Sequence, residues 1–221
     1  MTGPDLQFWQ QRFEQGTTPW DRGAANPQLQ AWLREGSLLP CRILVPGCGN
    51  GHEVLALAAA GFDVTALDYA PAAVEGVRRR LGQAGLEATV LQADVRTWSP
   101  QAGFDAIYEQ TCLCALHPDD WSIYAARLRD WLAPHGRLYA LFMQAPKPGA
   151  AEGLIQGPPY HCDIHGMRAL FPASQWRWPG PPYTRVDHPS GAHEIGVMLQ
   201  AEPRRGPGSV DIVELLGRSF P

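Results

Sequence analysis

Three glycines lie close together in the stretch VPGCGNG at residues 45–51, between a short apolar run and a helical segment. At a junction between a strand and a helix, glycines let the backbone turn sharply and approach a ligand closely. Their spacing is G-x-G-x-G, whereas the dinucleotide fingerprint G-x-G-x-x-G presents a helix N-terminus to a pyrophosphate. The loop therefore favours a ligand that needs backbone room but carries no phosphate, such as a sulfonium amino acid.

Acidic residues stand where the next expected strands end. Asp68 follows Gly47 by 21 residues and ends the second strand, where a carboxylate can accept both ribose hydroxyls. Asp94 comes just after the third strand and can hold an adenine amino group. A lone Asp at a strand end is more often a helix cap, but here the glycine loop and both acids follow in order. Ligands of open α/β sheets bind at this carboxyl edge, so together these residues predict a nucleoside site.

The elements that must position these residues alternate along the chain. Apolar spacing predicts helices over residues 5–15, 27–34, 53–60, 71–83, 118–132 and 163–170, and strands over 42–45, 63–67, 88–91, 104–108, 137–143, 184–188 and 193–201. This order predicts a mostly parallel seven-stranded sheet with helices on both faces and a closing antiparallel hairpin across 189–191. Pro134 and Gly136 are expected to stop the fifth helix. Glu109, at the end of the fourth strand, can bind a methionine amino group, position a substrate or be a satisfied strand-end acid.

Composition limits the classes of protein. The chain has 221 residues, 45% of them hydrophobic, which suits one domain with a real core. Its formal net charge of −4 argues against nucleic-acid and anionic-membrane partners, because both need a basic face. No apolar run reaches the roughly 18 residues of a membrane span, and the polar start does not resemble a signal peptide. Five cysteines at irregular spacings predict free thiols. We therefore expect a cytoplasmic protein, a monomer or weak dimer, with a small-molecule substrate.

Three stretches resemble a known family: FWQQRFEQGTTPWDRG at residues 8–23, VPGCGNGHEV at 45–54 and GPPY at 157–160, and CALHP at 114–118 also fits. On these residues the sequence resembles the class I S-adenosylmethionine-dependent methyltransferases. More narrowly it is similar to the thiopurine S-methyltransferase superfamily, and most of all to the plant thiol and halide methyltransferases. The resemblance spans roughly residues 8–200. The N-terminal W-x(10)-W pattern joined to VPGCG is its specific part, since the glycine loop alone indicates only a methyltransferase.

The resemblance implies a Rossmann-like class I methyltransferase fold over residues 1–221, with a helical cap over the cofactor at 1–35, a core at 36–201 and a tail at 202–221. It implies S-adenosylmethionine as cofactor and S-adenosylhomocysteine as product. It places three N-terminal aromatic residues on the cofactor, Gly47 at the methionine end, Asp68 at the ribose and Asp94 near the adenine. The predicted cofactor site comprises Trp9, Phe13, Trp20, Gly47, Cys48, Gly49, Asp68, Asp94, Val95, Glu109 and Gln110. The predicted substrate side comprises Trp20, Trp121 and Tyr160, with no metal ligand and no assigned catalytic residue.

The sequence departs from the family at three positions, and from most other methyltransferases at a fourth. Phe13 stands where members often have Trp, which keeps an aromatic face, and Gln110 stands where plant members tend to have Tyr. Trp121 stands where many members have an Arg that faces the substrate in thiopurine enzymes, so a thiopurine or anionic substrate is less favoured. Val45 stands where most methyltransferases have an acid, a lack that this family shares.

Other motifs have plainer interpretations. The Pro-Pro-Tyr of residues 158–160 resembles a motif of amino-group methyltransferases acting on nucleic acid, but that motif follows the fourth strand and this one follows the fifth. The cysteines match no zinc spacing, so small buried thiols are the better account. The late-loop histidines offer at most a helper base; they are His161, His165, His188 and His193.

The apparent lack of a general base bears on the substrate. A thiol with a pKa of about 8.5 is partly ionised at neutral pH, and sulfide or halides need even less help, whereas oxygen and amine nucleophiles more often need a base. The resemblance implies methyl transfer to a small thiol, sulfide, thiocyanate or halide, and the missing base supports such soft nucleophiles. The alternatives are O- or N-transfer to another small molecule, and a non-catalytic S-adenosylmethionine-binding protein, which the changes at Gln110 and Trp121 motivate. The glycine spacing disfavours a dinucleotide oxidoreductase.

Overall fold

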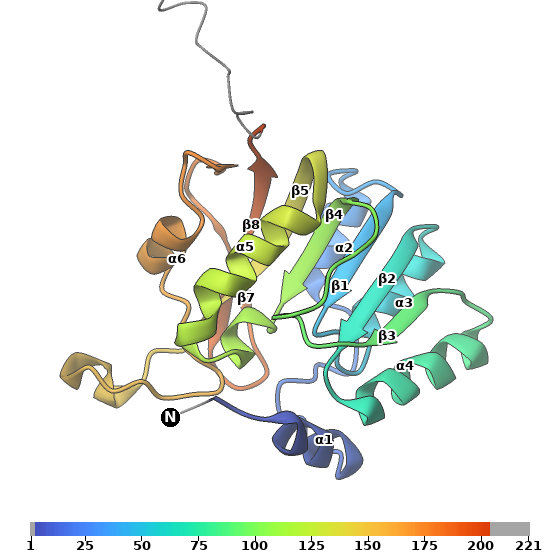
Figure 1. Ribbon diagram of the computed structural model, residues 1–221, viewed down its shortest axis with the longest axis horizontal. Helices are drawn as coiled ribbons and strands as arrows, with labels where there is room; N and C mark the ends of the chain where they lie inside the picture. Colours follow the sequence, from blue (N-terminus) through green and yellow to red (C-terminus); the bar gives the residue numbers. More distant parts are fainter. Residues whose placement is uncertain (1–2, 204–221) are drawn as a thin grey trace, which may run out of the picture.

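A sheet of eight strands runs through the protein (Figure 1), whose computed structural model describes residues 3–203. The strand order is β3-β2-β1-β4-β5-β8-β6, and β7 pairs with β8 along the edge that β6 also uses, at the opposite end of that strand. Strands β1 to β5 are mutually parallel, whereas β8 runs antiparallel to β5, β6 and β7. The strands are β1 (Arg42–Pro46), β2 (Asp63–Asp68), β3 (Thr89–Gln92), β4 (Phe104–Gln110), β5 (Leu132–Gln144), β6 (Trp176–Arg177), β7 (Thr184–Asp187) and β8 (His193–Ala201).

Helices cover both faces of the sheet. They are α1 (Leu6–Glu14), α2 (Pro27–Arg34), α3 (His52–Ala59), α4 (Pro71–Ala84), α5 (Trp121–Trp131) and α6 (Ile164–Leu170), with short 3₁₀ turns η1 (Leu113–Ala115), η2 (Pro118–Asp120) and η3 (Pro148–Glu152). One buried cluster joins one face of the sheet to α5 and α6 through Leu128 and Met167. The other joins the opposite face to α2, α3 and α4 through Leu29, Leu57 and Val77. The parallel strands β1, β2, β4 and β5 thus bury side chains on both faces, as a parallel sheet requires.

Helix α1 lies across the carboxyl ends of the parallel strands, below the arrowheads of β2 and β4 in Figure 1. Its N-terminus is capped by Asp5, whose side chain accepts a hydrogen bond from the backbone N–H of Phe8 at 2.8 Å. The side chain of Gln10 accepts a hydrogen bond from the backbone N–H of Ala72, which joins α1 to the start of α4 at 3.0 Å. The N-terminal segment is therefore fixed above the edge where the glycine loop and the strand-end acids lie.

The predicted α/β fold is confirmed, with two differences. The sheet has eight strands rather than seven, because β6 is only two residues long and too short for periodicity to show. Helix α5 ends at Trp131 and β5 begins at the next residue, so Pro134 and Gly136 lie within a strand rather than between elements. The register of β4 and β5 shifts there, and His135 has a positive φ of 64°. An irregularity of this kind is where a strand accepts proline.

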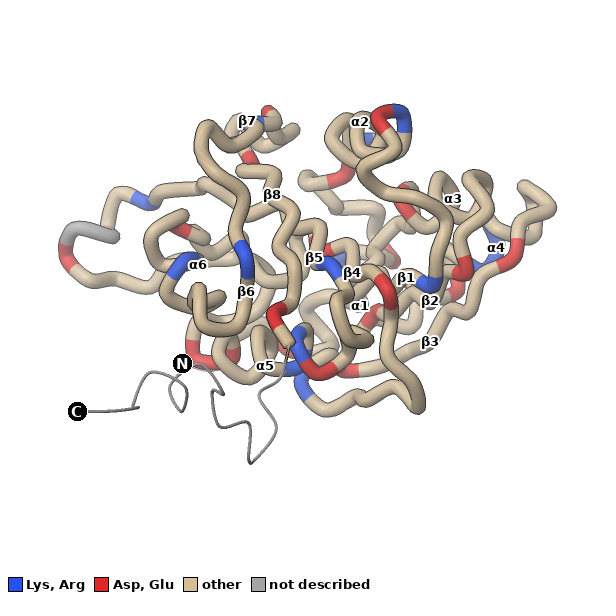
Figure 2. Tube along the Cα trace, turned by 90° about the horizontal axis from the view of Figure 1, so that it is seen from above, with Lys and Arg blue, Asp and Glu red and all other residues tan. Residues whose placement is uncertain are grey.

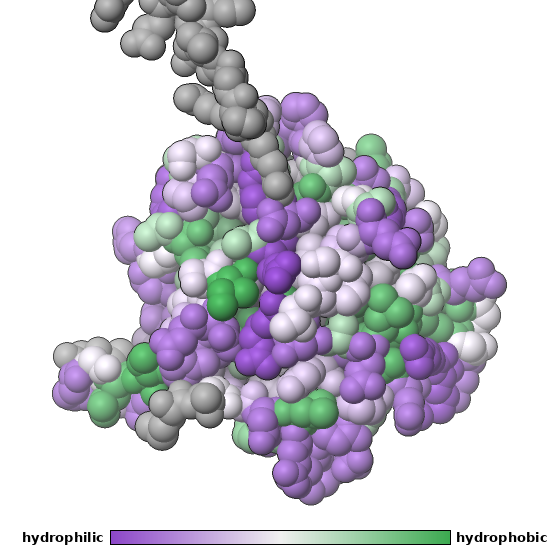
Figure 3. Space-filling view, viewed as in Figure 1, coloured by the Kyte–Doolittle hydropathy of each residue, from purple (hydrophilic) through white to green (hydrophobic). Residues whose placement is uncertain are grey.

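The surface mixes residue types. Lys and Arg positions are interspersed with Asp and Glu positions along the trace (Figure 2). On the face that α5 and α6 cover, hydrophobic residues form separate small patches among hydrophilic ones (Figure 3). Among residues 3–203, no helix is both long and apolar enough to cross a membrane.

Candidate active site

The glycine loop joins β1 to α3 in a conformation that other residues rarely adopt. Gly47, Gly49 and Gly51 all have positive φ, at 60°, 50° and 74°. Space is short as well: a Cβ on Gly47 would lie 2.9 Å from the Cβ of Cys112, and one on Gly51 would lie 2.5 Å from a methyl carbon of Val77. Both the dihedral angles and the packing therefore demand glycine, and the loop exposes backbone at the floor of the site.

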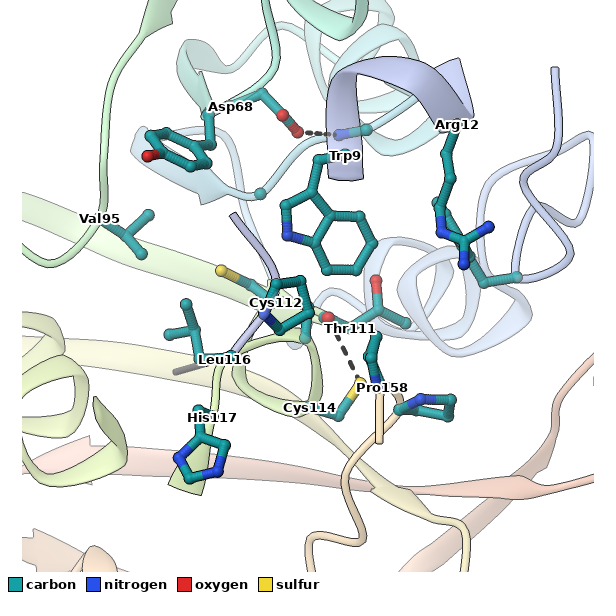
Figure 4. Close-up of a pocket in the computed structure, with 18 of the residues that line it drawn as sticks. Trp9, Arg12, Asp68, Val95, Thr111, Cys112, Cys114, Leu116, His117 and Pro158 are labelled. Carbon is teal, nitrogen blue, oxygen red and sulfur yellow. Dashed lines mark hydrogen bonds between the residues drawn. The ribbon is translucent and has the colours of Figure 1, made fainter. Parts of the chain in front are cut away.

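Asp68 ends β2 beside this loop. Its Oδ2 accepts a hydrogen bond from the backbone N–H of Gly49 at 2.8 Å (Figure 4), and its Oδ1 accepts one from Ala70 at 2.9 Å. Burial raises the pKa of Asp68, while these backbone hydrogen bonds lower it. A carboxylate has about four acceptor sites, so two remain for a ligand. Asp68 can therefore bind a pair of hydroxyl groups while it still anchors the loop.

Asp94 is engaged in a way that the sequence analysis did not foresee. Arg96 donates to its carboxylate through the backbone N–H and Nε at 2.9 Å to Oδ1, and through Nη2 at 2.6 Å to Oδ2. Nε also reaches Oδ2 at 3.1 Å. Burial opposes ionisation, but the hydrogen bonds and charge of Arg96 prevail and lower the pKa of Asp94. With its acceptor sites filled, Asp94 can hold an adenine amino group only if Arg96 moves.

Three aromatic residues of the N-terminal segment cover the site. Trp9 and Phe13 meet Trp20 edge to face, with ring centroids 5.7 and 6.1 Å away. The next residue, Asp21, accepts a hydrogen bond from the side chain of Asn50 in the glycine loop and lies 2.9 Å from Nε2 of His52. Its Oδ1 also accepts the backbone N–H of Gly23. The aromatic cover is thus attached directly to the loop beneath it.

A buried polar network attaches the same segment to β8. Glu194 is fully buried, and its Oε2 accepts hydrogen bonds from Nη2 of Arg22 and Nδ2 of Asn26, both at 3.0 Å. Its Oε1 accepts a longer bond of 3.3 Å from Nε2 of Gln110, whose own oxygen accepts the hydroxyl of Tyr108 at 2.7 Å. Three residues from two distant parts of the chain therefore donate to one carboxylate on β8.

A cavity of about 570 Å³ lies between the strand ends and the N-terminal segment. This is a usual size for a small-molecule site. Figure 4 shows Trp9 projecting into it from α1, above Thr111, Cys112 and Cys114 at the end of β4. Eight predicted residues line this cavity: Trp9, Phe13, Trp20, Gly47, Gly49, Asp68, Asp94 and Val95.

Five predicted residues do not line this cavity. Cys48 and Gln110 line a smaller hollow of about 60 Å³, which shares Trp20, Gly47, Gly49 and Thr111 with the large cavity. The other three, Glu109, Trp121 and Tyr160, line neither hollow.

Glu109, Trp121 and Tyr160 make structural contacts. Oε1 of Glu109 accepts the backbone N–H of Leu113 at 2.7 Å, and burial, together with nearby Glu194, raises the pKa of Glu109 to about 7. The indole N–H of Trp121 donates to the carbonyls of Leu113 and Leu116 at 2.9 and 3.0 Å. The backbone N–H of Tyr160 donates to the carbonyl of Cys114 at 2.7 Å, and its ring packs edge-on against His117.

The cysteines are free thiols in the structure, as predicted. Cys48, Cys112, Cys114 and Cys162 are buried, and burial raises the pKa of each thiol. A buried thiol of high pKa is a poor nucleophile and metal ligand. Among residues 3–203, no group of three His, Cys, Asp or Glu side chains is arranged to hold a metal ion.

The sequence analysis missed several residues of the site. Thr111 lines the cavity with a positive φ of 60°, which is uncommon for a non-glycine residue. His188 and Ser190 line it from the turn after β7. Arg22 and Glu194 are paired although 172 residues separate them. Only the first three residues of this group follow a strand directly or nearly so, which is the one local signal that the chain offered.

The sheet, the glycine loop and the acid at the end of β2 define a class I S-adenosylmethionine-dependent methyltransferase. A family model described as thiopurine S-methyltransferase matches residues 4–202. The chain belongs to the thiopurine S-methyltransferase family, and it is a methyltransferase that uses S-adenosylmethionine.

The comparisons with individual proteins agree. The chain is 30% identical over 215 residues to a protein of Arabidopsis thaliana named probable thiol methyltransferase 2, which covers 95% of this chain and 83% of the relative. It is 35% identical over 155 residues to thiocyanate methyltransferase 1 of Brassica oleracea, covering 69% of this chain and 66% of the relative. A solved 1,6-didemethyltoxoflavin-N1-methyltransferase of Burkholderia thailandensis, with S-adenosylhomocysteine bound, shares the fold with a TM-score of 0.69 at 22% identity, covering 87% of this chain and 85% of that one.

Proposed function

We propose that this enzyme transfers the methyl group of S-adenosylmethionine to a small soft nucleophile: a thiol, sulfide, thiocyanate or a halide. When bound, the cofactor supplies a methyl carbon activated by its sulfonium, and the sulfur keeps the bonding electron pair when the nucleophile displaces it. The protein's contribution is then to align the nucleophile and to exclude water.

The cavity fits such a cofactor. Gly47 and Gly49 provide an approachable backbone, and Asp68 keeps two acceptor sites for the ribose hydroxyls. Trp9 and Phe13 cover the same space from α1. Val95, which is buried at the end of β3, offers an apolar wall for the adenine. In this proposal the strand ends bind the cofactor from below, and residues 1–35 form a cap over it.

The wall on the side of β4 and β5 is apolar and rich in sulfur, which supports a soft acceptor. Cys114, Met143, Pro158 and Pro159 line it. A large, polarisable anion such as thiocyanate loses less hydration free energy against such a wall than a compact alkoxide would, and it gains favourable contacts with the sulfur atoms. The names of the two plant relatives, a thiol and a thiocyanate methyltransferase, point to the same acceptor class.

The observation that carries the proposal is the state of His188, a buried histidine that lines the cavity from the turn after β7. The backbone N–H of Ser190 donates to Nδ1 of His188 at 3.2 Å, so Nδ1 is an acceptor and the neutral ring carries its proton on Nε2. Burial, reinforced by the positive charge of Arg22, lowers the pKa of His188 to about 4. His188 is therefore neutral at neutral pH and a poor base for the acceptor.

Other titratable groups are no better placed. Glu109 has a pKa of about 7 but is fully buried and does not line the cavity. His117 lines the cavity, but in Figure 4 its ring lies beyond Leu116, away from Trp9, and it packs on Tyr160. A nucleophile that arrives already ionised is the one that this site can use.

The test compares the pH dependence of two acceptors. With a small thiol, kcat/KM should rise about tenfold per pH unit up to the pKa of the thiol itself, about 8.5. With thiocyanate, which has no proton to lose, kcat/KM should be flat from pH 6 to 9. His117→Ala should leave both profiles unchanged. Methylated products are measured by gas chromatography, and calorimetric binding of S-adenosylhomocysteine to wild type and Asp68→Ala checks the cofactor site.

The alternatives give different results. Turnover of only oxygen or nitrogen acceptors, with a bell-shaped profile, would replace the proposal with O- or N-transfer. Cofactor binding without turnover of any acceptor would indicate a protein that only binds S-adenosylmethionine. A cytoplasmic location and a monomeric or weakly dimeric state stay predictions.

A further inference from the structure

Arg22 has a hydrogen-bond donor with no protein partner. Its Nη2 donates to Glu194 at 3.0 Å, and the side chain is only 17% exposed. Its Nε is buried, and within the described part of the chain no acceptor lies in reach of it. Buried donors are almost always paired, because an unpaired one loses its hydration without compensation. The guanidinium therefore has one N–H that the described part of the protein leaves unpaired.

The surroundings of Arg22 identify where that acceptor would lie. Arg22 lines the hollow of about 60 Å³ beside the glycine loop, together with Cys48 and Gln110. The hollow adjoins the large cavity at Gly47 and Thr111, which line both. Its volume is several times the roughly 10–15 Å³ that one water molecule needs. It is therefore a polar side chamber that opens from the floor of the cofactor site.

The charges of this chamber suit one end of the cofactor. Arg22 supplies a guanidinium to the lining of the chamber, and Asp21 and Glu53 supply carboxylates. A guanidinium binds carboxylates with paired, charge-assisted hydrogen bonds, and a carboxylate can accept from an ammonium group. The methionine end of S-adenosylmethionine carries both an α-carboxylate and an α-ammonium. The glycine loop itself begins with Val45 and supplies no acid for that end.

We propose that Arg22 binds the α-carboxylate of the cofactor through its free Nε–H, within this chamber. The inference rests on the methyl donor of the proposed function but not on the identity of the methyl acceptor. In this arrangement the carboxylate of Glu194 on β8 also orients the guanidinium of Arg22, because it accepts a hydrogen bond from Nη2. The N-terminal segment then contributes a polar contact to the cofactor as well as an aromatic cover.

The experiment compares two ligands, one with and one without the amino-acid end that carries the α-carboxylate. S-adenosylhomocysteine has the amino-acid end, and 5′-methylthioadenosine has the same adenosine and sulfur without it. Calorimetry gives Kd for both ligands with wild type, Arg22→Gln and a matched control, Arg78→Gln, whose Nη2 donates to the carbonyl of Val90 away from the site. Loss of one charged hydrogen bond corresponds to roughly a 10–100-fold change in Kd.

We expect Arg22→Gln to weaken S-adenosylhomocysteine by that factor and to leave 5′-methylthioadenosine within about twofold of wild type, while Arg78→Gln changes neither. Equal losses for both ligands would overturn the proposal, because they would mean that Arg22 only supports the fold. Unchanged Kd values for both would overturn it too. If Arg22→Gln does not fold, Arg22→Lys is the substitute, because it lacks Nε–H but keeps the charge. It should weaken S-adenosylhomocysteine by a smaller factor and again leave 5′-methylthioadenosine unchanged. Wild type that binds neither ligand would instead contradict the cofactor assignment.

Discussion

Glu194 offers the sharpest test of how the N-terminal segment is held. Replacing it with alanine removes the acceptor of Arg22, Asn26 and Gln110 at once. Asn26 is fully buried, so its amide would be left without an acceptor, whereas Arg22 is 17% exposed and can turn partly to water. Removing one partner of a buried ion pair costs about 3–5 kcal/mol, and the exposure of Arg22 places the expected loss near about 3 kcal/mol. That is a large share of the roughly 5–15 kcal/mol that stabilise a domain.

The double variant measures the coupling free energy between Arg22 and Glu194 separately from the other contacts that each residue makes. Arg22→Ala should cost a similar amount, because it leaves a buried carboxylate with only two neutral donors. When Glu194→Ala and Arg22→Ala are combined, neither charge is left unpaired. The double variant should therefore cost little more than either single one, which gives a coupling free energy of about 2 kcal/mol or more.

The assay is equilibrium unfolding in urea at pH 7, with midpoints and slopes fitted for all four proteins. Arg185 and Asp187 on β7 form a matched control pair, 3.4 Å apart and 63% and 89% exposed. Their coupling should be no more than about 0.5 kcal/mol. Additive losses in the Glu194 cycle, or single losses below about 1 kcal/mol, would refute the reasoning.

Three further predictions follow from single contacts. The pKa of Glu109 is raised to about 7, so its contribution to stability is present below about pH 4.5 and lost as pH rises through 7. Wild type should therefore lose about 3 kcal/mol relative to Glu109→Gln between pH 5 and 8, and parallel urea midpoints across this range would contradict this. Gly51→Ala should cost more than 2 kcal/mol, roughly a left-handed penalty plus overpacking against Val77, whereas Gly61→Ala, with φ of 84° and open space, should cost about 1 kcal/mol. Trp121→Phe should lower stability by about 1 kcal/mol through loss of its indole hydrogen bond and leave the KM of the acceptor unchanged; a tenfold rise in KM would return Trp121 to the substrate side.

The parts of the fold that sequence predicts are those with local causes. The apolar run before Gly47 becomes β1, and the acid at the end of the next run, Asp68, reaches the same edge because both strands are parallel. Glycine spacing identified a loop whose three glycines do need positive φ. These features depend on residues close together in the chain, which is why periodicity and turn residues were enough.

The polar network around Glu194 could not be predicted from local sequence patterns, for a geometric reason. In the sequence, Glu194 alternates with apolar neighbours and looks like the solvent side of an edge strand. In the structure β8 is an interior strand between β5 and β7, and the N-terminal segment covers it, so the side chain is buried. No residue near Glu194 in the sequence indicates that Arg22 is its partner, because the two meet only when the sheet and the N-terminal segment have folded together.

Asp94 shows the opposite error, in which a local signal was present but was not used. Arg96 stands only two residues later, and a carboxylate and a guanidinium at that spacing in a turn can pair directly. The position of Asp94 at the cavity was predicted and the structure places it there, yet its acceptor sites are filled. Placement at a strand end therefore indicates where a side chain lies, but its free hydrogen-bonding capacity depends on its neighbours.

The anchors of the aromatic cover connect stability with ligand binding. Trp20 is followed immediately by Asp21, bonded to the glycine loop, and by Arg22, bonded to β8. Both anchors are contacts within the protein, so the cover is positioned by the fold before any ligand arrives, and little ordering entropy remains to oppose binding. By linkage, a ligand that binds only the folded state stabilises it in proportion to the logarithm of its concentration over Kd. Substitutions at Asp21 or Glu194 should therefore weaken the fold and the cofactor site together, whereas substitutions at Trp9 should affect the site far more than the fold.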